Sequence, residues 1–300
     1  RLVYLQVFRY EDLNEQAESN RTAIVPIVPN RGLILDRNGV VLATNYSAYT
    51  LEITPSRAGV LDETIDALSK VVDIQARDRR RFKRLMEESR NFESLPIRTR
   101  LTDQEVARFT AQRYRFPGVD IKARLFRNYP LGDVASHAIG YIGRINQTEK
   151  ARIQDSEDEA NYRGTEYIGK LGIEHSFESA LHGATGVEQM ETSAGGRAVR
   201  KLSSHAATPG DSVMLSIDIK LQKLIEELYG SRRGALVAID PRNGEILALV
   251  SKPTFDPNLF VEGIDAENWA ALNESIDKPL LNRALRGTYP PGSTYKPFMA

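Results

Sequence analysis

The sequence predicts an α+β protein in which a mixed α/β region at residues 1–208 precedes the beginning of a second domain at residues 209–300. Short apolar runs are joined by Asn-Gly turns at Asn38-Gly39 and Asn243-Gly244, which is typical of antiparallel hairpins. After residue 208 a strand, a helix and a hairpin follow one another, ahead of a helix start near residue 293. The chain of 300 residues is 41% hydrophobic and 8% aromatic, which is enough to build cores for about two domains.

The first region begins with strands and continues with helices. Residues 33–42 predict a hairpin with its turn at Asn-Gly. Residues 60–116 predict helix, with a clear helix start at Thr102, where Glu105 completes a capping box. We place a head subdomain near residues 60–130.

The remainder of the first region is less regular. Residues 155–163 are acidic and poor in apolar side chains, so we predict a mobile loop there. Apolar residues recur every fourth position through residues 172–181, which indicates an amphipathic helix. Residues 187–199 alternate as a strand pair around Gly195-Gly196.

The second region opens after Thr208-Pro209-Gly210 with a strand predicted at residues 213–217. Asp218 is placed to cap a helix that runs to Leu228. Residues 236–239 and 246–250 are expected to pair as a hairpin. This order of elements is the one expected when helices cover an antiparallel sheet.

The charges balance, with 40 Lys plus Arg and 40 Asp plus Glu. The chain therefore has no net field that would recruit nucleic acid. The most basic run, residues 77–84, is followed one turn later by Glu87 and Glu88, and we predict a solvated helix face there.

We expect no metal and no organic cofactor. The chain has no cysteine, so disulfides, thiol chemistry and the usual thiolate ligands of zinc are excluded. No glycine-rich loop has the spacing of a phosphate cradle. The histidines lie on different predicted elements and lack metal-ligand spacing; they are His137, His175, His182 and His205.

The segment with the strongest chemical signal is residues 289–296, Tyr-Pro-Pro-Gly-Ser-Thr-Tyr-Lys. Two prolines and a glycine end any preceding element, so that a helix can begin near Ser293. Ser293 and Lys296 are three residues apart and share a face of that helix. A lysine beside a serine can take its proton, and free N–H groups at a helix start stabilise an oxyanion. The pattern predicts acyl transfer, with Ser293 as nucleophile and Lys296 as general base.

The same Ser-x-x-Lys spacing occurs between Ser275 and Lys278. This second pair has no Pro-Pro-Gly before it, and Pro279 disfavours helix at the lysine. We interpret it as a chance occurrence.

The residues around Ser293 resemble a known family. Residues 282–284 and 287–297 are similar to the active-site segment of class B penicillin-binding proteins, above all those that act in cell elongation. Other segments that resemble the family precede this one, in the same order as in the family. Those that resemble its non-catalytic pedestal are residues 31–39, 127–130, 137–143 and 169–174, and those that resemble its transpeptidase domain are residues 234–241, 244–248, 253 and 255–258. The resemblance spans nearly the whole chain.

The resemblance implies a dimerisation-type pedestal at residues 1–208 and the first part of a transpeptidase domain, of the serine β-lactamase-like fold, at residues 209–300. It implies a peptidoglycan D,D-transpeptidase or carboxypeptidase in which Ser293 is acylated by a stem peptide and trapped by β-lactams. Its partners would be peptidoglycan stem peptides, a membrane glycan polymerase of the SEDS type and other elongation factors, with no nucleic acid.

The resemblance also implies a single-pass protein of the bacterial inner membrane with its folded part in the periplasm. The apolar stretch Leu2 to Phe8 is either the trailing end of a removed membrane helix or the apolar face of a first helix. Charged pedestal residues beside turns, such as Arg31, Asp36 and Arg127, are expected to fix a turn or an interdomain contact.

One departure from the family pattern bears on activity. The pattern requires a Ser-x-Asn and a Lys-Thr-Gly after the nucleophile. Within these 300 residues the one Ser-x-Asn is at Ser89, before Ser293, and there is no Lys-Thr-Gly. We therefore expect this 300-residue chain to be inactive by itself, and residues 236–250 to expose apolar surface where further strands would pack.

Two other function classes stay open. A serine β-lactamase or β-lactam sensor would share the acylation chemistry. A non-catalytic scaffold that binds elongation partners would not need the absent motifs.

Overall fold

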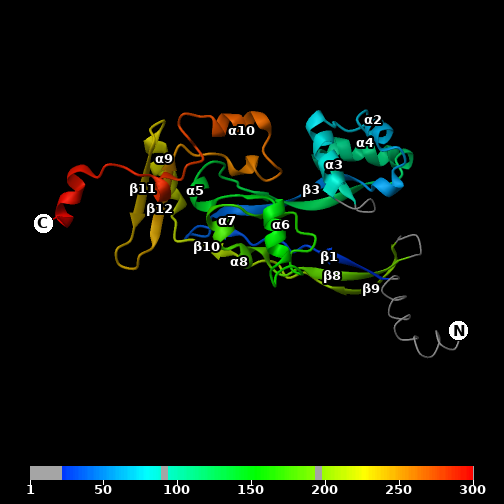
Figure 1. Cartoon of the computed structure of the whole chain (residues 1–300), viewed down its shortest axis with the longest axis horizontal. Coiled ribbons are helices and arrows are strands. Elements are labelled where there is room, and N and C mark those ends of the chain that lie inside the picture. The colour runs from blue at the N-terminus through cyan, green and yellow to red at the C-terminus, as the bar shows by residue number, and fades with distance from the viewer. Residues whose placement is uncertain (1–21, 89–93, 193–197, 300) are drawn as a thin grey trace, which may run out of the picture. The chain divides into compact units, whose positions relative to one another are not determined.

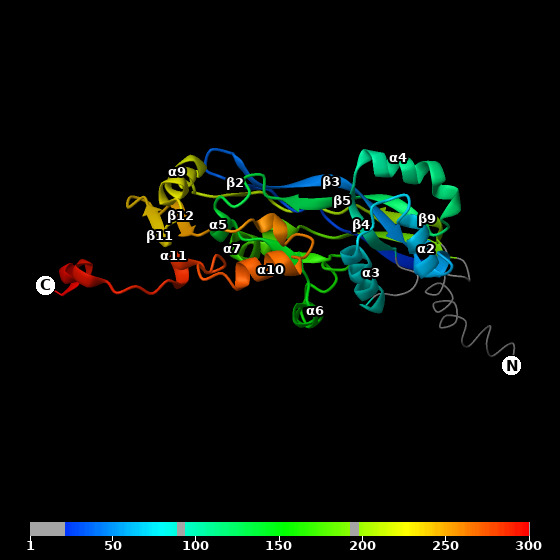
Figure 2. The same ribbon diagram turned by 90° about the horizontal axis from the view of Figure 1, so that it is seen from above.

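The computed structural model describes residues 22–88, 94–192 and 198–299. The chain divides into two compact units, one of residues 46–126 and one that combines residues 1–45 with residues 127–300 (Figure 1, Figure 2). Strands β3 (Val41–Ile53) and β5 (Val119–Asn128) lead from one unit into the other and back. The first unit takes in most of the region where we predict a head, and the boundary at residue 208 stays a prediction. The stretch Leu2 to Phe8 lies outside the described residues.

The unit at residues 46–126 combines strands with helices around one core. Its helices are α2 (Leu61–Leu68), α3 (Ala76–Glu88) and α4 (Asp103–Gln112), with the 3-10 helices η2 (Pro55–Arg57) and η3 (Arg113–Arg115). Strand β4 (Leu95–Leu101) pairs antiparallel with β3, which also pairs with β5. Leu51, Ile97 and Phe109 lie at the centre of the core and are almost fully buried.

Two features of this unit test the sequence predictions. The capping box of α4 is confirmed, because the Thr102 hydroxyl accepts from the Glu105 N–H and the Glu105 carboxylate accepts from the Thr102 N–H at 2.9 Å. The prediction of helix throughout residues 60–116 is wrong at β4. There Leu95, Ile97, Thr99 and Leu101 are buried, a period-two pattern that belongs to a strand.

The larger unit contains several small sheets. Strands β1 (Thr22–Ile27), β8 (Gly186–Thr192) and β9 (Ala198–His205) form one antiparallel sheet. Strand β2 (Ile34–Leu35) lies between β3 and β10 (Val213–Met214), β6 (Ile142–Arg144) pairs with β7 (Tyr167–Gly169), and β11 (Gly234–Ile239) pairs with β12 (Ile246–Lys252). The strand pair predicted at residues 187–199 is present as β8 and β9, but the second strand continues to His205, beyond the predicted range, and the turn at 193–197 lies outside the described residues.

The helices of this unit are short. They are α5 (Ser136–Ile139), α6 (Gln147–Gln154), α7 (Gly172–Ser176), α8 (Glu178–His182), α9 (Ile219–Tyr229), α10 (Ala266–Asn273), α11 (Arg283–Arg286) and the 3-10 helices η4 (Pro257–Leu259) and η5 (Gly292–Phe298). Ile34, Leu42, Leu181 and Ile219 meet in its core, so strands near the start of the chain pack with α8 and α9.

Two local predictions need correction. The helix predicted at residues 172–181 is interrupted, because Phe177 leaves the helical backbone at φ −109° and ψ 24° and separates α7 from α8. The acidic segment 155–163 consists of turns, but its end is anchored. Asn161 donates to the Gly183 carbonyl at 2.9 Å and accepts from the Thr185 N–H at 2.7 Å.

The hairpin predicted at residues 33–42 is confirmed, and Asp36 organises its turn. Asp36 Oδ1 accepts from the N–H groups of Asn38 and Val40 at 2.8 Å each, and Oδ2 accepts from the N–H of Ile219 at 3.2 Å. Burial alone would raise the pKa of Asp36, but these backbone donors outweigh burial and hold the pKa below its usual value. The turn therefore accepts a hydrogen bond from the first turn of α9.

The elements after residue 208 largely follow the prediction. Asp218 caps α9 through its Oδ1, which accepts from the N–H groups of Lys220 at 3.0 Å and Leu221 at 3.2 Å. The strand predicted at residues 213–217 is shorter, since β10 holds two residues and pairs in parallel with β2. The β11–β12 hairpin is confirmed and exposes apolar side chains, as expected: Val237 is 43%, Ile239 56% and Ile246 36% exposed.

Helix α9 also buries a carboxylate, Glu226, and this leads to a prediction about pH. Glu226 Oε1 accepts from the Ala135 N–H at 3.0 Å and from Gln222 Nε2 at 2.7 Å. Burial raises the pKa of Glu226 in spite of these donors. A raised carboxyl pKa in the folded state means that ionisation opposes folding, so this side chain's contribution to stability falls as pH rises from the ordinary carboxyl pKa through the raised one.

We expect Glu226→Gln, which keeps the shape and an acceptor oxygen, to be more stable relative to wild type at pH 7.5 than at pH 4.5. Tm values at the two pH values check this. Glu227→Gln, an exposed neighbour on α9, is the control and should change Tm little. An equal shift of Glu226→Gln at both pH values would contradict the prediction.

Candidate active site

Ser293 and Lys296 lie together on η5, and both side chains are exposed. A helix begins where the sequence predicts one, with Gly292 at φ 55° as its first residue, but it is wound as a 3-10 helix. The side chains three apart eclipse each other in such a helix, so the two residues share a side. In the described part of the chain no hydrogen bond joins Ser293 Oγ to Lys296 Nζ.

The tight winding has a physical cause in this segment. Every described residue from 288 to 299 is exposed, so tertiary packing, which supplies most helix stability in proteins, is missing there. Pro297 also removes one backbone donor. The hydroxyl of Thr294 donates to the carbonyl of Pro291 and closes the first turn locally.

The chain that leads into η5 is, by contrast, firmly held. Asn282 caps α11 and donates through Nδ2 to the His137 carbonyl at 3.2 Å. The N–H of the buried Arg283 donates to Ser251 Oγ at 2.9 Å, and that hydroxyl donates to the Leu281 carbonyl at 3.1 Å. Asn282 and Arg283 are thus anchored to α5 and β12, about ten residues before the serine.

The second Ser-x-x-Lys pair has a different local structure. Lys278 has a φ of 44°, so the backbone turns left-handed at the lysine, and Ser275 Oγ accepts from the N–H of Asp277 at 3.2 Å. No helix spans the pair. Its backbone therefore does not give the serine and lysine a common helical face, which agrees with interpreting it as chance.

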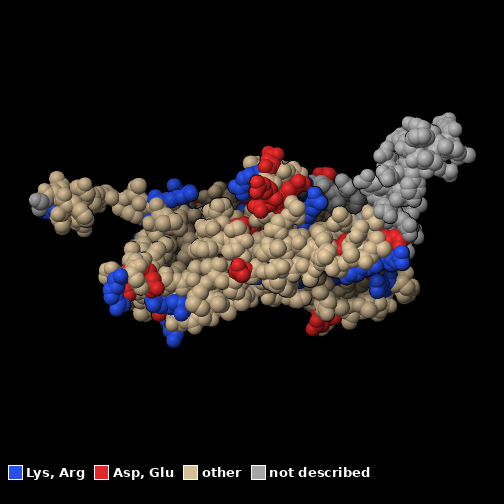
Figure 3. All heavy atoms as spheres, turned by 90° about the horizontal axis from the view of Figure 1, so that it is seen from below, with Lys and Arg blue, Asp and Glu red and all other residues tan. Residues whose placement is uncertain are grey.

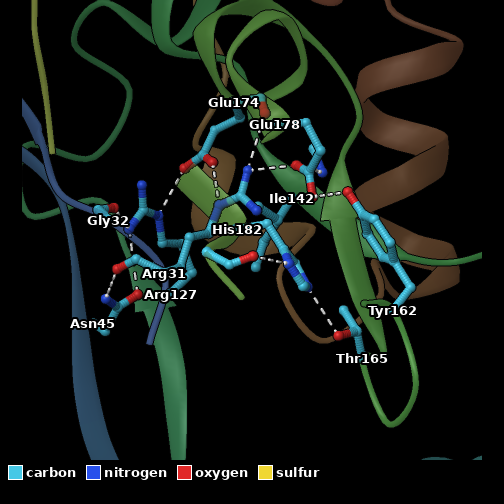
Figure 4. A network of polar contacts seen from close by, with 12 residues as sticks. Arg31, Gly32, Asn45, Arg127, Ile142, Tyr162, Thr165, Glu174, Glu178 and His182 are labelled. Atoms are coloured by element: carbon cyan, nitrogen blue, oxygen red, sulfur yellow. Dashed lines mark hydrogen bonds and ion pairs between the residues drawn. The ribbon is translucent and has the colours of Figure 1, made fainter. Parts of the chain in front are cut away.

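Two of the three pedestal residues that the sequence singles out, Arg31 and Arg127, meet in a buried ionic network around Glu174 (Figure 4). Glu174 is fully buried; its Oε1 lies 2.7 Å from Arg127 Nε and its Oε2 lies 2.7 Å from Arg31 Nε. Arg127 NH1 donates to the Gly32 carbonyl at 2.7 Å, and Asn45 Nδ2 donates to the Arg31 carbonyl at 2.6 Å. The network joins the start of β2, the end of β5 and α7.

Further polar side chains extend this network beyond Glu174. Arg31 NH2 lies 2.6 Å from Glu178 Oε2, and Tyr162 donates to the other Glu178 oxygen at 3.2 Å. The ring of His182 stacks on Tyr162 at 4.4 Å, and its Nε2 lies 2.9 Å from Thr165 Oγ1. Sequence reasoning missed Glu178, Tyr162 and His182, and no local spacing distinguishes them from solvated polar residues.

Electrostatics agree with a structural role for the network. Burial would lower the pKa of Arg31, but Glu174 and Glu178 more than offset it and raise the pKa. Burial, reinforced by Glu174, raises the pKa of Tyr129, whose hydroxyl donates to Glu174 at 3.2 Å. Arg31 and Tyr129 therefore stay protonated near neutral pH, and the network does not pair a nucleophile with a base. Asp36 thus fixes a turn, as the sequence predicts, whereas Arg31 and Arg127 join segments that are far apart in the chain.

Among residues 22–88, 94–192 and 198–299, no three His, Asp or Glu side chains are grouped as a metal site would require. The helices of the described chain include none with the length and apolar composition needed to cross a bilayer. On the face drawn in Figure 3, basic and acidic side chains form small separate groups.

Two protein families match the chain. The penicillin-binding protein dimerisation domain matches residues 26–215. The penicillin-binding protein transpeptidase domain matches residues 234–300, which include Ser293 and Lys296.

Curated relatives match along the full chain. The peptidoglycan D,D-transpeptidase MrdA of Escherichia coli K12 is 44% identical over 299 residues, which are 100% of this chain and 47% of the relative. MrdA of Acinetobacter baumannii is 43% identical over 300 residues, covering 100% of this chain and 44% of the relative. The chain thus spans about half the length of these relatives.

Solved structures are similar as well. A complex between PBP2 and MreC from Helicobacter pylori has a TM-score of 0.71 at 26% identity, covering 92% of this chain and 51% of that one. Pseudomonas aeruginosa PBP2 in complex with WCK 5153 has a TM-score of 0.57 at 34% identity, covering 92% of this chain and 40% of the other.

Proposed function

Because the chain belongs to the penicillin-binding proteins, whose dimerisation domain it matches over residues 26–215, we propose that its protein is a peptidoglycan D,D-transpeptidase of cell elongation. The observation that carries the proposal is the match of residues 234–300 to the transpeptidase domain, with Ser293 and Lys296 on one helical turn inside it. Relatives named peptidoglycan D,D-transpeptidase over the whole chain favour this function over a β-lactamase or a scaffold.

The proposed reaction is a two-step acyl transfer. Lys296 takes the proton of Ser293 Oγ, which attacks the carbonyl between the two D-alanines of a stem peptide. The C–N bond breaks, the terminal D-alanine leaves with the proton, and an ester to Ser293 remains. An amine of a second stem peptide then attacks the ester carbonyl. The amide bond that forms is the cross-link, and Ser293 is released. Water in place of the amine would give carboxypeptidase activity.

β-Lactams are expected to acylate the same serine, which gives a direct test. The full-length protein incubated with benzylpenicillin should gain the mass of one whole drug molecule, because ring opening loses no atom. Tryptic cleavage at Arg286 should place the adduct on the peptide that starts at Gly287. An adduct on another peptide, or none, would reject the proposal.

Lys296 is proposed as the base of the acylation step. Lys296→Ala in the full-length protein should slow acylation by about a hundredfold or more, the usual order for a lost general base. Lys278→Ala, the matching change in the other Ser-x-x-Lys pair, is the control and should acylate normally. Stopped-flow measurement with a fluorescent penicillin compares them, and near-normal acylation of Lys296→Ala would assign the base elsewhere.

Partners and location follow from the same assignment. The similar Helicobacter pylori structure is a complex of PBP2 with MreC, which supports an MreC-like elongation factor as a partner of this protein. We further assign a SEDS-type glycan polymerase as a membrane partner, and a periplasmic position with a single helix in the inner membrane. Co-purification of the full-length protein with these partners tests the assignment.

A further inference from the structure

Helix α3 carries four exposed cations that have no ionic partner in the described chain. They are Arg77, Arg80, Lys83 and Arg84. Their spacing places them on one side of the helix, opposite Phe82, which is 2% exposed and belongs to the core of its unit. None of the four lies within 4 Å of a carboxylate among the residues described.

The neighbouring arginines of the same helix show that partners are available nearby. Arg79 pairs with Asp66 at 2.5 Å, and Arg81 pairs with Asp78 at 3.4 Å. The chain therefore neutralises those arginines that face its own surface. Of the two acidic residues predicted to balance the run, Glu87 is exposed at the end of α3 and forms no ion pair with it among the described residues, and the side chain of Glu88 lies outside what the structure describes.

The arrangement is also unfavourable for the helix itself. Arg77 and Arg80 lie near the amino end of α3, where the helix dipole disfavours positive charge, and Glu87 lies near the carboxyl end, where it disfavours negative charge. Four like charges within eight residues repel one another at low salt. An external anion bound along the four cations would offset their mutual repulsion and the positive charge near the amino end of the helix.

We propose that the exposed face of α3 binds the carboxylates of uncross-linked peptidoglycan stem peptides. This inference rests on the proposed function, under which the protein acts on a polymer that presents free stem-peptide carboxylates at regular intervals. Arginine side chains suit this partner because the guanidinium can take a carboxylate through two parallel hydrogen bonds. The face belongs to the unit at residues 46–126, so it is separate in the chain from Ser293 and would hold the polymer rather than react with it.

The test is co-sedimentation of the full-length protein with purified peptidoglycan sacculi, at low and at high salt. The variant replaces Arg77, Arg80, Lys83 and Arg84 with glutamine. Its charge-matched control replaces four exposed cations from other elements with glutamine, namely Arg57, Lys150, Arg152 and Lys220. We expect the α3 variant to bind about tenfold more weakly, as four exposed ionic contacts of a few tenths of a kcal/mol each would give, and to lose most of the salt dependence.

The control should bind as wild type does, and wild-type binding should vanish on sacculi whose carboxylates have been amidated. Equal binding by the α3 variant and the control would overturn the proposal. The proposal would also be overturned if the α3 variant lost binding to vesicles of anionic phospholipid but still bound sacculi as wild type does, because the partner would then be a membrane. Benzylpenicillin acylation of the variant should equal that of wild type. A failure of acylation in wild type itself would reject the proposed function, whereas the binding proposal is decided by the sacculus measurements alone.

Discussion

Replacing Ser293 with alanine is expected to abolish covalent labelling of the full-length protein by a fluorescent penicillin. The change removes one oxygen from an exposed side chain, so the fold should be unaffected. Without that oxygen no ester can form, and the residual signal should equal that of heat-denatured protein. Labelling on a denaturing gel measures the outcome, and circular dichroism confirms that the variant is folded.

Ser275→Ala is the matched control for this change. Ser275 has the same Ser-x-x-Lys spacing, yet a left-handed lysine at φ 44° ends its turn, so labelling should remain at the wild-type level. Full labelling of Ser293→Ala, or loss of labelling in Ser275→Ala, would show that the wrong serine has been assigned.

Glu174→Ala is expected to cost about 3–5 kcal/mol of folding free energy, the range found when one partner of a buried ion pair is removed. Glu174 is fully buried, and Arg127, 2% exposed, depends on it for its ion pair. The alanine would leave the buried guanidinium of Arg127 without its counter-charge and would also remove the acceptor of the Tyr129 hydroxyl. Thermal unfolding and hydrogen exchange at Gly32, whose N–H donates to the Leu181 carbonyl at 2.8 Å, measure the loss.

Glu159→Ala is the control, because Glu159 forms an exposed ion pair with Arg163 that should contribute less than about 0.5 kcal/mol. Those molecules of Glu174→Ala that remain folded should still be acylated by penicillin at near the wild-type rate. Similar stability of the two variants would mean that the network is not an important source of stability.

Local signals in the sequence predict much of this fold. The capping box at Thr102, the cap at Asp218 and both Asn-Gly turns depend on residues two to four apart, and the structure shows all of them. The active-site segment is also local, and the sequence identifies it through Pro-Pro-Gly before Ser293. The sequence does not predict how the side chains of Ser293 and Lys296 lie relative to each other, because packing against other elements would have to set that geometry.

Long-range features could not be predicted in the same way. Arg31 and Glu174 are 143 positions apart, and nothing near either residue signals that they pair. The parallel pairing of β2 with β10 joins segments on opposite sides of the predicted boundary at residue 208. The prediction of helix at β4 is wrong for a related reason: the segment lies between two helical stretches, and its pairing with β3, more than forty positions earlier, selects the strand.

The hydrogen bond from Ile219 to Asp36 has a consequence for protein engineering. The Ile219 N–H in the first turn of α9 finds its acceptor in a hairpin 183 positions earlier, so segments on the two sides of the predicted boundary at residue 208 share this hydrogen bond. A chimera that exchanges only the residues after 216 between relatives must keep an aspartate at position 36, or the graft will start with an unsatisfied buried donor. The smallest interchangeable part of this protein is therefore the helix together with its distant turn.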